Sequence, residues 1–128
     1  MAHTVSKKHP EFRVGEKKDE KDIHCENNPS YGIEIKGSSN KSQIFANRSY
    51  AQPSSDSEVK NKNGYYLAIN FEKISKDNPK PRILLIRFGY LVHKDWIPQN
   101  AATGQQARLA PETYAKKFET IYKLDVKQ

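Results

Sequence analysis

Polar and apolar residues alternate on both sides of a turn in residues 21–36, KDIHCENNPSYGIEIK. Asn27, Asn28 and Pro29 are residues that favour tight turns. Two short alternating segments on either side of such a turn predict an antiparallel β-hairpin, with its loop at residues 26–30.

The simplest hairpin register pairs Cys25 with Tyr31 and Ile23 with Ile33, which places Asp22 opposite Glu34. Successive side chains of a strand point to opposite faces of the sheet. We interpret the face that carries Ile23, Ile33 and Ile35 as core. The other face is expected to serve chemistry or to meet solvent, and it carries the four polar side chains Asp22, His24, Glu34 and Lys36.

Two further strands and a helix are indicated by the later pattern. Residues 64–71 are rich in β-formers, and their period of two predicts one strongly buried face, made of Tyr65, Leu67, Ile69 and Phe71. Residues 82–92 form the most continuously apolar run, which predicts a central strand covered on both sides, with a bend or bulge at Gly89. Pro111 is expected to open a helix, because proline suits the first helical turn. The apolar stripe of that helix would hold Tyr114, Phe118, Ile121 and Tyr122.

The remaining segments are polar and predict connections. Residues 1–20 read as a loose arm in which Phe12 and Val14 anchor a short extended piece, and residues 53–63 read as an exposed linker. Residues 93–109 read as a long loop anchored by Trp96 and Ile97. We therefore expect a single domain of the α/β or α+β class, residues 1–128, with a mixed sheet of four to five strands and the C-terminal helix packed on it.

Charge narrows the choice of partners. The 128-residue chain carries a net charge of +7, and its pI is near 9.4, which favours polyanions because neutralised phosphates release counterions. The single cysteine, Cys25, excludes an internal disulfide and is expected to be a small buried strand residue. We find no apolar run of the kind that a signal peptide or a membrane span requires, so we expect a soluble, cytoplasmic protein of bacterial or archaeal cells.

The opposed carboxylates of Asp22 and Glu34 indicate a site for a cation. Directly opposed strand residues have Cβ atoms roughly 5 Å apart, and at an effective dielectric of about 20 two such charges repel by about 3 kcal/mol. Mg²⁺ is commonly held by one or two carboxylates, with waters and phosphate as further ligands. Lys36, on the same face, adds an ammonium that suits phosphodiester hydrolysis. The alternative is an ordinary amphipathic hairpin with a solvated polar face.

The motif Asp22…Glu34-Ile35-Lys36 resembles the catalytic core of the PD-(D/E)xK nucleases, although Lys21 stands where the name has proline. The longer run over residues 20–52 resembles more narrowly the ScaI-like type II restriction endonucleases. It holds, in order, E-K-D-I, E-I-K followed by S-S, and N-R-S-Y-A-Q. The similarity continues through RFGYLVHKDW and ATGQQARL, so that it covers most of the chain.

This resemblance implies a restriction-endonuclease-like core and a Mg²⁺-dependent endonuclease that cleaves double-stranded DNA, with Mn²⁺ as a possible substitute. Asp22 and Glu34 would hold the metal, the carbonyl of Ile35 would add an oxygen, and Lys36 would orient or help to deprotonate the attacking water. The products would be a 5′-phosphate and a 3′-hydroxyl. A palindromic site has two equivalent scissile phosphates, so we expect a homodimer, and a restriction enzyme implies a cognate DNA methyltransferase. The nuclease families usually place a helix before the first catalytic strand, and residues 1–20 show no convincing one.

Two polar segments are candidates for DNA contact. Ser, Asn, Lys and Arg commonly bind phosphates, and amide and guanidinium groups can read base edges. A polar surface loop is the alternative for each residue taken singly. The phosphate candidates are Ser38, Ser39, Asn40, Lys41, Asn47 and Arg48, and the base candidates are Gln99, Asn100, Gln105, Gln106 and Arg108.

Two other functions stay open at this point. The chain could be an inactive, basic DNA-binding module, which incubation with supercoiled plasmid with and without Mg²⁺ would distinguish from a nuclease. It could also be an RNA-directed nuclease toxin, which the same preparation would reveal on folded RNA.

Overall fold

The computed structural model describes residues 9–17, 20–47, 50–51, 62–99 and 105–125. Within these residues a six-stranded sheet has the order β1-β2-β3-β5-β6-β9, and a three-stranded sheet has the order β4-β8-β7. The α+β class with a mixed sheet is confirmed, but the main sheet has six strands because β1 and β9 extend its edges. The strands of this sheet are β1 (Phe12–Val14), β2 (Ile23–Cys25), β3 (Ile33–Ser38), β5 (Gly64–Phe71), β6 (Ile83–Leu91) and β9 (Phe118–Lys123).

The predicted hairpin is formed by β2 and β3, and its Ile23–Ile33 pair is confirmed. The predicted Cys25–Tyr31 pair was wrong, because Tyr31 lies in the loop and not on β3. Its loop contains a short 3-10 helix, η1 (Pro29–Tyr31). Asn28 caps this helix, since its side-chain oxygen accepts a hydrogen bond from the Ser30 amide over 3.1 Å. Cys25 is a buried strand residue, as predicted.

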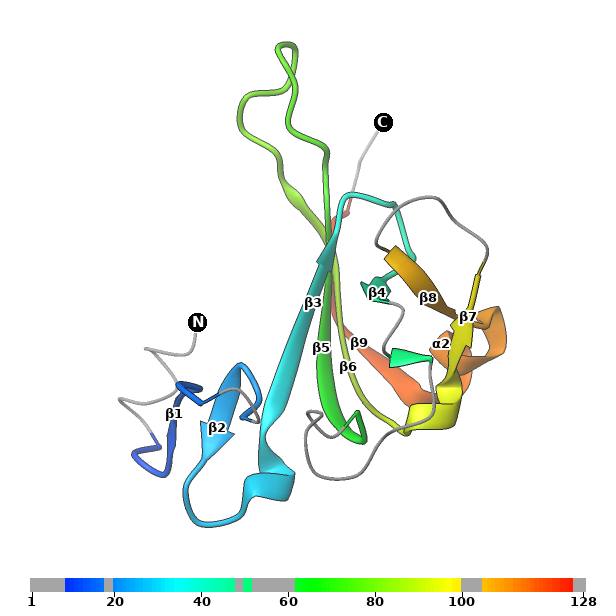
Figure 1. The fold of residues 1–128 in the computed structure, drawn as a ribbon. Helices are drawn as coiled ribbons and strands as arrows, with labels where there is room; N and C mark the ends of the chain where they lie inside the picture. Colours follow the sequence, from blue (N-terminus) through cyan, green and yellow to red (C-terminus); the bar gives the residue numbers. More distant parts are fainter. Residues whose placement is uncertain (1–8, 18–19, 48–49, 52–61, 100–104, 126–128) are drawn as a thin grey trace.

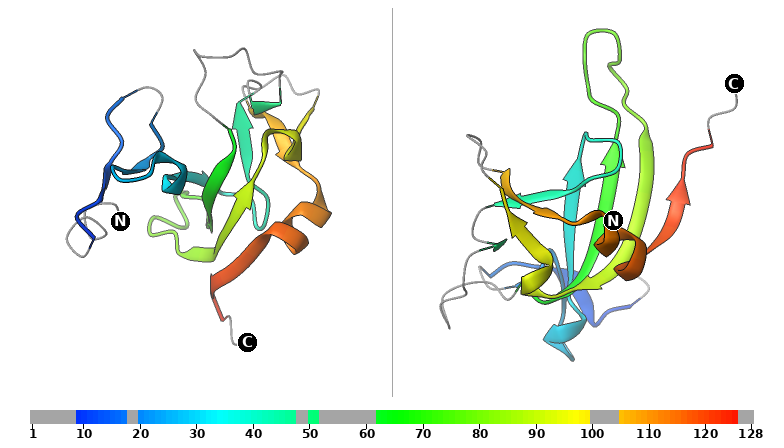
Figure 2. Two further views of the ribbon diagram at one scale, coloured as in Figure 1. Left: turned by 90° about the horizontal axis from the view of Figure 1, so that it is seen from below. Right: turned by 90° about the vertical axis from the view of Figure 1, so that its right-hand side faces the viewer.

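Strand β3 pairs in parallel with β5, so Glu34 lies beside Tyr66 and Lys36 beside Ala68. The prediction of which β5 face is more buried was wrong. Tyr66 and Ala68 are fully buried, whereas most of the alternating set that begins at Tyr65 is half-buried. A period of two identifies two faces but not the layer that covers each of them, and here the smaller sheet lies over the Tyr66 face (Figure 1, Figure 2).

Strand β6 lies between β5 and β9, but most of its side chains are only half-buried, so the expectation of cover on both sides was wrong. The register shift along β9 falls between Ile86 and Arg87 and not at Gly89. Gly89 has a different role. A Cβ atom there would lie 2.1 Å from the Lys117 carbonyl oxygen, so glycine allows the chain after the helix to approach β6 closely.

The smaller sheet shows that the prediction of a long loop over residues 93–109 was wrong. Its strands are β4 (Phe45–Asn47), β7 (Trp96–Pro98) and β8 (Gln105–Leu109), and a 3-10 helix, η3 (His93–Asp95), precedes β7. Trp96 is an anchor as expected, with only 3% of its surface exposed. The polar composition of this segment concealed two short strands, in which Trp96, Ala107 and Leu109 are buried. The core between the two sheets holds Ile44, Ala46, Tyr50, Tyr66, Ala68, Leu91, Trp96, Ala107 and Leu109.

The predicted C-terminal helix is shorter than its apolar stripe suggested. Helix α2 (Pro111–Lys117) begins at the expected proline, and β9 follows it directly. Tyr114 and Phe118 pack against the core, but Ile121 and Tyr122 are exposed. The run from Phe118 contains β-branched and aromatic residues, and pairing with the edge of β6 satisfies its backbone.

The N-terminal segment contains β1, which pairs with β2 and confirms the short extended piece at Phe12 and Val14. Arg13 ties this strand to the next turn through two hydrogen bonds to the Glu20 carboxylate, of 3.0 and 2.7 Å. Most of the predicted linker, residues 53–61, lies outside the described residues. Among the described residues, no helix is long and apolar enough to cross a membrane.

Candidate active site

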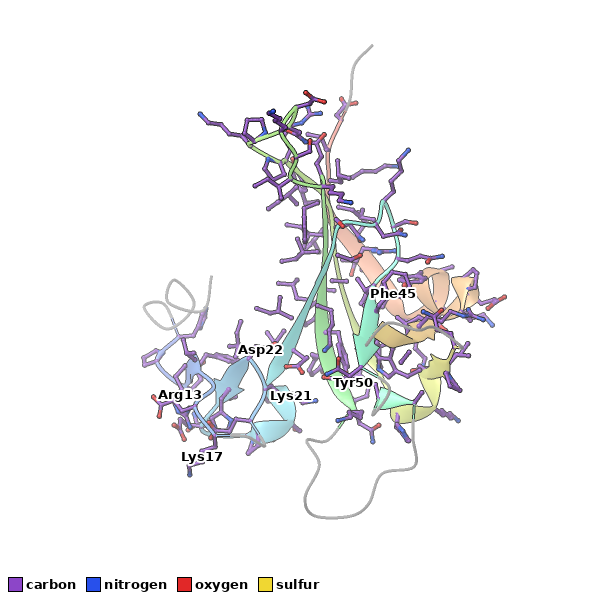
Figure 3. All side chains as sticks on the ribbon, turned by 45° about the horizontal axis from the view of Figure 1, so that its top comes forward. Arg13, Lys17, Lys21, Asp22, Phe45 and Tyr50 are labelled. Atoms are coloured by element: carbon purple, nitrogen blue, oxygen red, sulfur yellow. The ribbon has the colours of Figure 1, made fainter. Side chains whose placement is uncertain are left out.

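Asp22 and Glu34 lie side by side across the β2–β3 hairpin. The Asp22 amide donates to Glu34 Oε1 over 3.3 Å, and Asp22 Oδ2 accepts a hydrogen bond from the Ile35 amide over 2.8 Å. Asp22, labelled in Figure 3, is one residue before β2 and is exposed. The hairpin thus brings Asp22 and Glu34 together, with each carboxylate hydrogen-bonded to a backbone amide of the opposite segment.

This polar face was expected to serve chemistry or to meet solvent, and Glu34 does not meet solvent, since it is only 3% exposed. The parallel pairing turns Glu34 and Lys36 to the same face as Tyr66 and Ala68, toward the core between the sheets. Burying a carboxylate is costly unless it is hydrogen-bonded, so its partners matter.

Tyr50 is one such partner, and the sequence analysis gave it no role. Its hydroxyl donates a hydrogen bond to Glu34 Oε2 over 2.7 Å. Its ring packs edge-on against Trp96, with the two centroids 5.3 Å apart. Burial and the nearby Glu34 charge raise the pKa of Tyr50, so the phenol keeps its proton and stays a donor. Tyr50 belongs to the motif N-R-S-Y-A-Q, from which only Asn47 and Arg48 are predicted as DNA contacts.

Two lysines meet the ring of Tyr50. The ammonium of Lys36 lies 4.1 Å from the ring centroid, and that of Lys62 lies 4.4 Å from it. Both distances are within the range of cation–π attraction. Lys62 is only 6% exposed, and its carbonyl accepts a hydrogen bond from the Tyr66 hydroxyl over 2.6 Å. Sequence reasoning missed Lys62 because it lies at the end of a segment with linker composition.

Lys21, at the position of the missing proline, is also buried. Its ammonium donates to the Asn63 carbonyl oxygen over 3.1 Å and lies 5.6 Å from the centroid of the Tyr66 ring. Gly64 and Gly32 pack against its side chain. Lys21 therefore joins the start of the hairpin to the start of β5, which no pattern in the sequence indicated.

The donor set fits a hard divalent cation with water ligands. Two neighbouring carboxylates are present, and the described part of the chain contains no group of three or more His, Cys, Asp or Glu that could form a closed cage. Mg²⁺ is bound in this way, by one or two carboxylates with its remaining positions open. Asp22, Glu34 and the Ile35 carbonyl are the groups that could hold it, which stays a prediction.

The structure gives some of the predicted DNA contacts a structural role. Asn40 Oδ1 accepts from the Ser42 and Gln43 amides, 3.0 Å each, and Ser38 Oγ accepts from the Asn40 amide over 3.0 Å. These two side chains therefore build the turn after β3. Ser39, Lys41 and Asn47 are exposed, Gln99 and Arg108 are half-buried, the backbones of Gln105 and Gln106 form part of β8, and Arg48 and Asn100 lie outside the described residues.

Asp22, one residue before β2, therefore lies beside the Glu34-Ile35-Lys36 segment of β3 within a mixed sheet, and this order of residues resembles the PD-(D/E)xK motif. The chain belongs to the ScaI restriction endonuclease family, whose model matches residues 1–122.

One relative is the type II restriction enzyme ScaI of Streptomyces caespitosus, which is 46% identical over 102 residues. The match covers 78% of this chain and 44% of the relative, so the chain spans less than half of that enzyme's length. No solved structure matches the chain.

Proposed function

We propose that the chain is a Mg²⁺-dependent endonuclease that cleaves double-stranded DNA, as a type II restriction endonuclease or a minimal or truncated relative of one, with Mn²⁺ as a possible substitute. The observation that carries this proposal is the contact between Asp22 and Glu34, with Lys36 two residues further along the same strand. Family membership and the net charge of +7 support DNA as the substrate.

In this proposal Asp22 and Glu34 hold the metal, with the Ile35 carbonyl as a further oxygen ligand. The bound ion supplies positive charge that stabilises the phosphate oxygens as the bond breaks. Lys36 orients the attacking water as the ammonium, or helps to remove its proton when it is the neutral amine. The water oxygen bonds to phosphorus, the bond between phosphorus and the 3′ oxygen breaks, and the 3′ oxygen takes up the proton that the water loses, so that a 5′-phosphate and a 3′-hydroxyl remain.

The active unit is proposed to be a homodimer, because one site cuts one strand and a palindromic duplex presents two equivalent phosphates. Sedimentation with a short duplex in Ca²⁺ tests this, and two chains per duplex are expected. One chain per duplex at saturating protein, or nicking without linear product, contradicts the dimer. A DNA methyltransferase that protects the same sequence is the expected partner system.

The function is tested on supercoiled plasmid with and without Mg²⁺, using Glu34→Gln and Lys36→Met. Glutamine keeps the size and hydrogen-bonding capacity of the buried Glu34, whereas alanine would leave a cavity and an unpaired Tyr50 hydroxyl. Both variants should lose at least about 100-fold in cleavage rate, while binding to duplex in Ca²⁺ is retained. Cutting at the wild-type rate by either variant would show that the catalytic assignment is wrong.

The same preparation separates the remaining alternatives. Duplex binding without any Mg²⁺-dependent cleavage would indicate an inactive DNA-binding module. Cleavage of folded RNA in preference to plasmid would indicate an RNA-directed nuclease.

A further inference from the structure

Both oxygens of the Glu34 carboxylate have a fixed donor. Oε1 accepts from the Asp22 amide over 3.3 Å, and Oε2 accepts from the Tyr50 hydroxyl over 2.7 Å. A glutamate side chain is long, and it loses much rotational freedom when it is buried. Two donors that arrive at different oxygens fix the plane of the carboxylate as well as its position.

Tyr50 is itself held rigidly. It is buried in the core between the sheets, and Trp96 packs edge-on against its ring. Such packing leaves the phenol little freedom to change rotamer. The donor that holds Glu34 is therefore anchored to the smaller sheet, whereas Glu34 belongs to the larger one.

The ring of Tyr50 contacts the lysine of the motif as well. The Lys36 ammonium lies 4.1 Å from the ring centroid. One aromatic side chain thus meets both functional groups of the Glu-x-Lys motif, through its hydroxyl at Glu34 and through its ring at Lys36.

We propose that Tyr50 is a positioning residue of the active site, whose hydroxyl orients the Glu34 carboxylate toward a divalent cation and whose ring locates the Lys36 ammonium. This inference rests on the proposed function, because it assigns Glu34 to the metal. Partners that orient the ligands of a metal commonly account for 10- to 100-fold in metal affinity.

The variant Tyr50→Phe removes the hydroxyl and keeps the ring, so it tests orientation of Glu34 with the core packing intact. Mn²⁺ binding to the full chain without DNA is measured by electron paramagnetic resonance, which needs no catalytic activity. We expect the Kd for Mn²⁺ to rise about tenfold. The Mg²⁺ concentration for half-maximal cleavage should rise by a similar factor, with a smaller change in kcat at saturating Mg²⁺.

Tyr114→Phe is the matched control. The Tyr114 hydroxyl is also partly buried, and it accepts a hydrogen bond from the Ile44 amide over 2.8 Å, outside the site. We expect this variant to lose a similar amount of stability in urea and to bind Mn²⁺ as the wild type does. An effect of Tyr50→Phe on metal affinity that Tyr114→Phe reproduces would reduce Tyr50 to a purely structural residue and would overturn the inference.

Two failures are distinguishable. If the wild type binds Mn²⁺ and cleaves DNA but Tyr50→Phe has unchanged Mn²⁺ affinity, the positioning role is wrong and the proposed function stands. If the wild type neither binds Mn²⁺ nor cleaves DNA, the proposed function fails and the inference fails with it.

Discussion

Arg87 donates a hydrogen bond from Nη2 to Oδ1 of Asn70 over 2.9 Å, between neighbouring strands β6 and β5. Arg87 is 7% exposed and Asn70 is fully buried. The side-chain nitrogen of Asn70, Nδ2, donates to the backbone carbonyl oxygens of Asn40 and Gln43, and each donor–acceptor distance is 3.0 Å. This pair therefore fastens the turn after β3, which carries candidate DNA contacts, onto the larger sheet.

Replacement of Asn70 by leucine should destabilise the fold by about 2–4 kcal/mol, because it removes an acceptor from a buried guanidinium and a donor from two carbonyls at nearly constant volume. Urea unfolding followed by the fluorescence of Trp96, the single tryptophan, measures the change. Asn27→Ala, at an exposed turn position, is the control and should change stability by less than about 0.5 kcal/mol. Equal stability of the two variants would contradict the assigned role of Asn70.

Gly89→Ala should be strongly destabilising, since the added methyl group would lie 2.1 Å from the Lys117 carbonyl oxygen, where the backbone must move. A loss of about 1–3 kcal/mol is expected from such overpacking. Gly37→Ala is the matched control on β3, because the nearest atom to its added Cβ would be a ring carbon of the Phe71 side chain at 3.3 Å and not a backbone atom. Thermal unfolding of both variants tests the difference, and a tolerated Gly89→Ala would show that the α2–β9 junction lies further from β6.

Glu72 and Arg82, which lie in the link between β5 and β6, make the stability of the fold depend on pH. Hydrogen bonds from the Arg82 side chain and amide lower the pKa of Glu72 from 4.5 to about 2. A lowered pKa in the folded state stabilises the fold above the ordinary value, and this stabilisation is lost as the pH falls from 4.5 toward 2. The wild type should therefore exceed Glu72→Gln in unfolding midpoint near neutral pH, and the gap should close across that acidic window. A gap that does not vary with pH would contradict this reading of the ion pair.

Affinity for nonspecific duplex should fall steeply with salt, because the chain has 22 Lys and Arg against 15 Asp and Glu. Each phosphate contact adds about 0.9 to the slope of log affinity against log salt concentration. Fluorescence anisotropy with a labelled duplex in Ca²⁺ measures the slope. A nearly flat dependence would argue against a duplex-binding protein.

Local signals predicted the hairpin and its Ile23–Ile33 pair, but not that Tyr31 would belong to the 3-10 helix of its loop. The alternation around Asn27 to Pro29 gave the Ile23–Ile33 register that the structure confirms, and the same register placed Asp22 beside Glu34. Both results depend on contacts between residues close in sequence, for which strand period and turn chemistry are informative.

The surroundings of Asp22 and Glu34 could not be predicted from the hairpin, because distant segments of the chain form them. Nothing in residues 21–36 says that β5 pairs in parallel with β3, or that the smaller sheet covers the face of Glu34. Tyr50 and Lys62 reach the site from outside the hairpin, so neither its period nor its spacing pointed to them. The strands β7 and β8 were missed for a related reason, since short strands in a polar segment give too few positions for a pattern.

The parallel pairing of β3 with β5 has a consequence for the order of folding. Paired residues of the two strands, such as Glu34 and Tyr66, are separated along the chain by β4 and the segment after it. The entropic cost of closing this long loop must be overcome before the contacts between β3 and β5 can stabilise the fold. The hairpin, by contrast, can form from neighbouring residues. We expect the two carboxylates to meet early and the Tyr50 and Lys62 surroundings to be completed only as the last contacts form, so that a partly folded chain would present a carboxylate pair without its organised cationic neighbours.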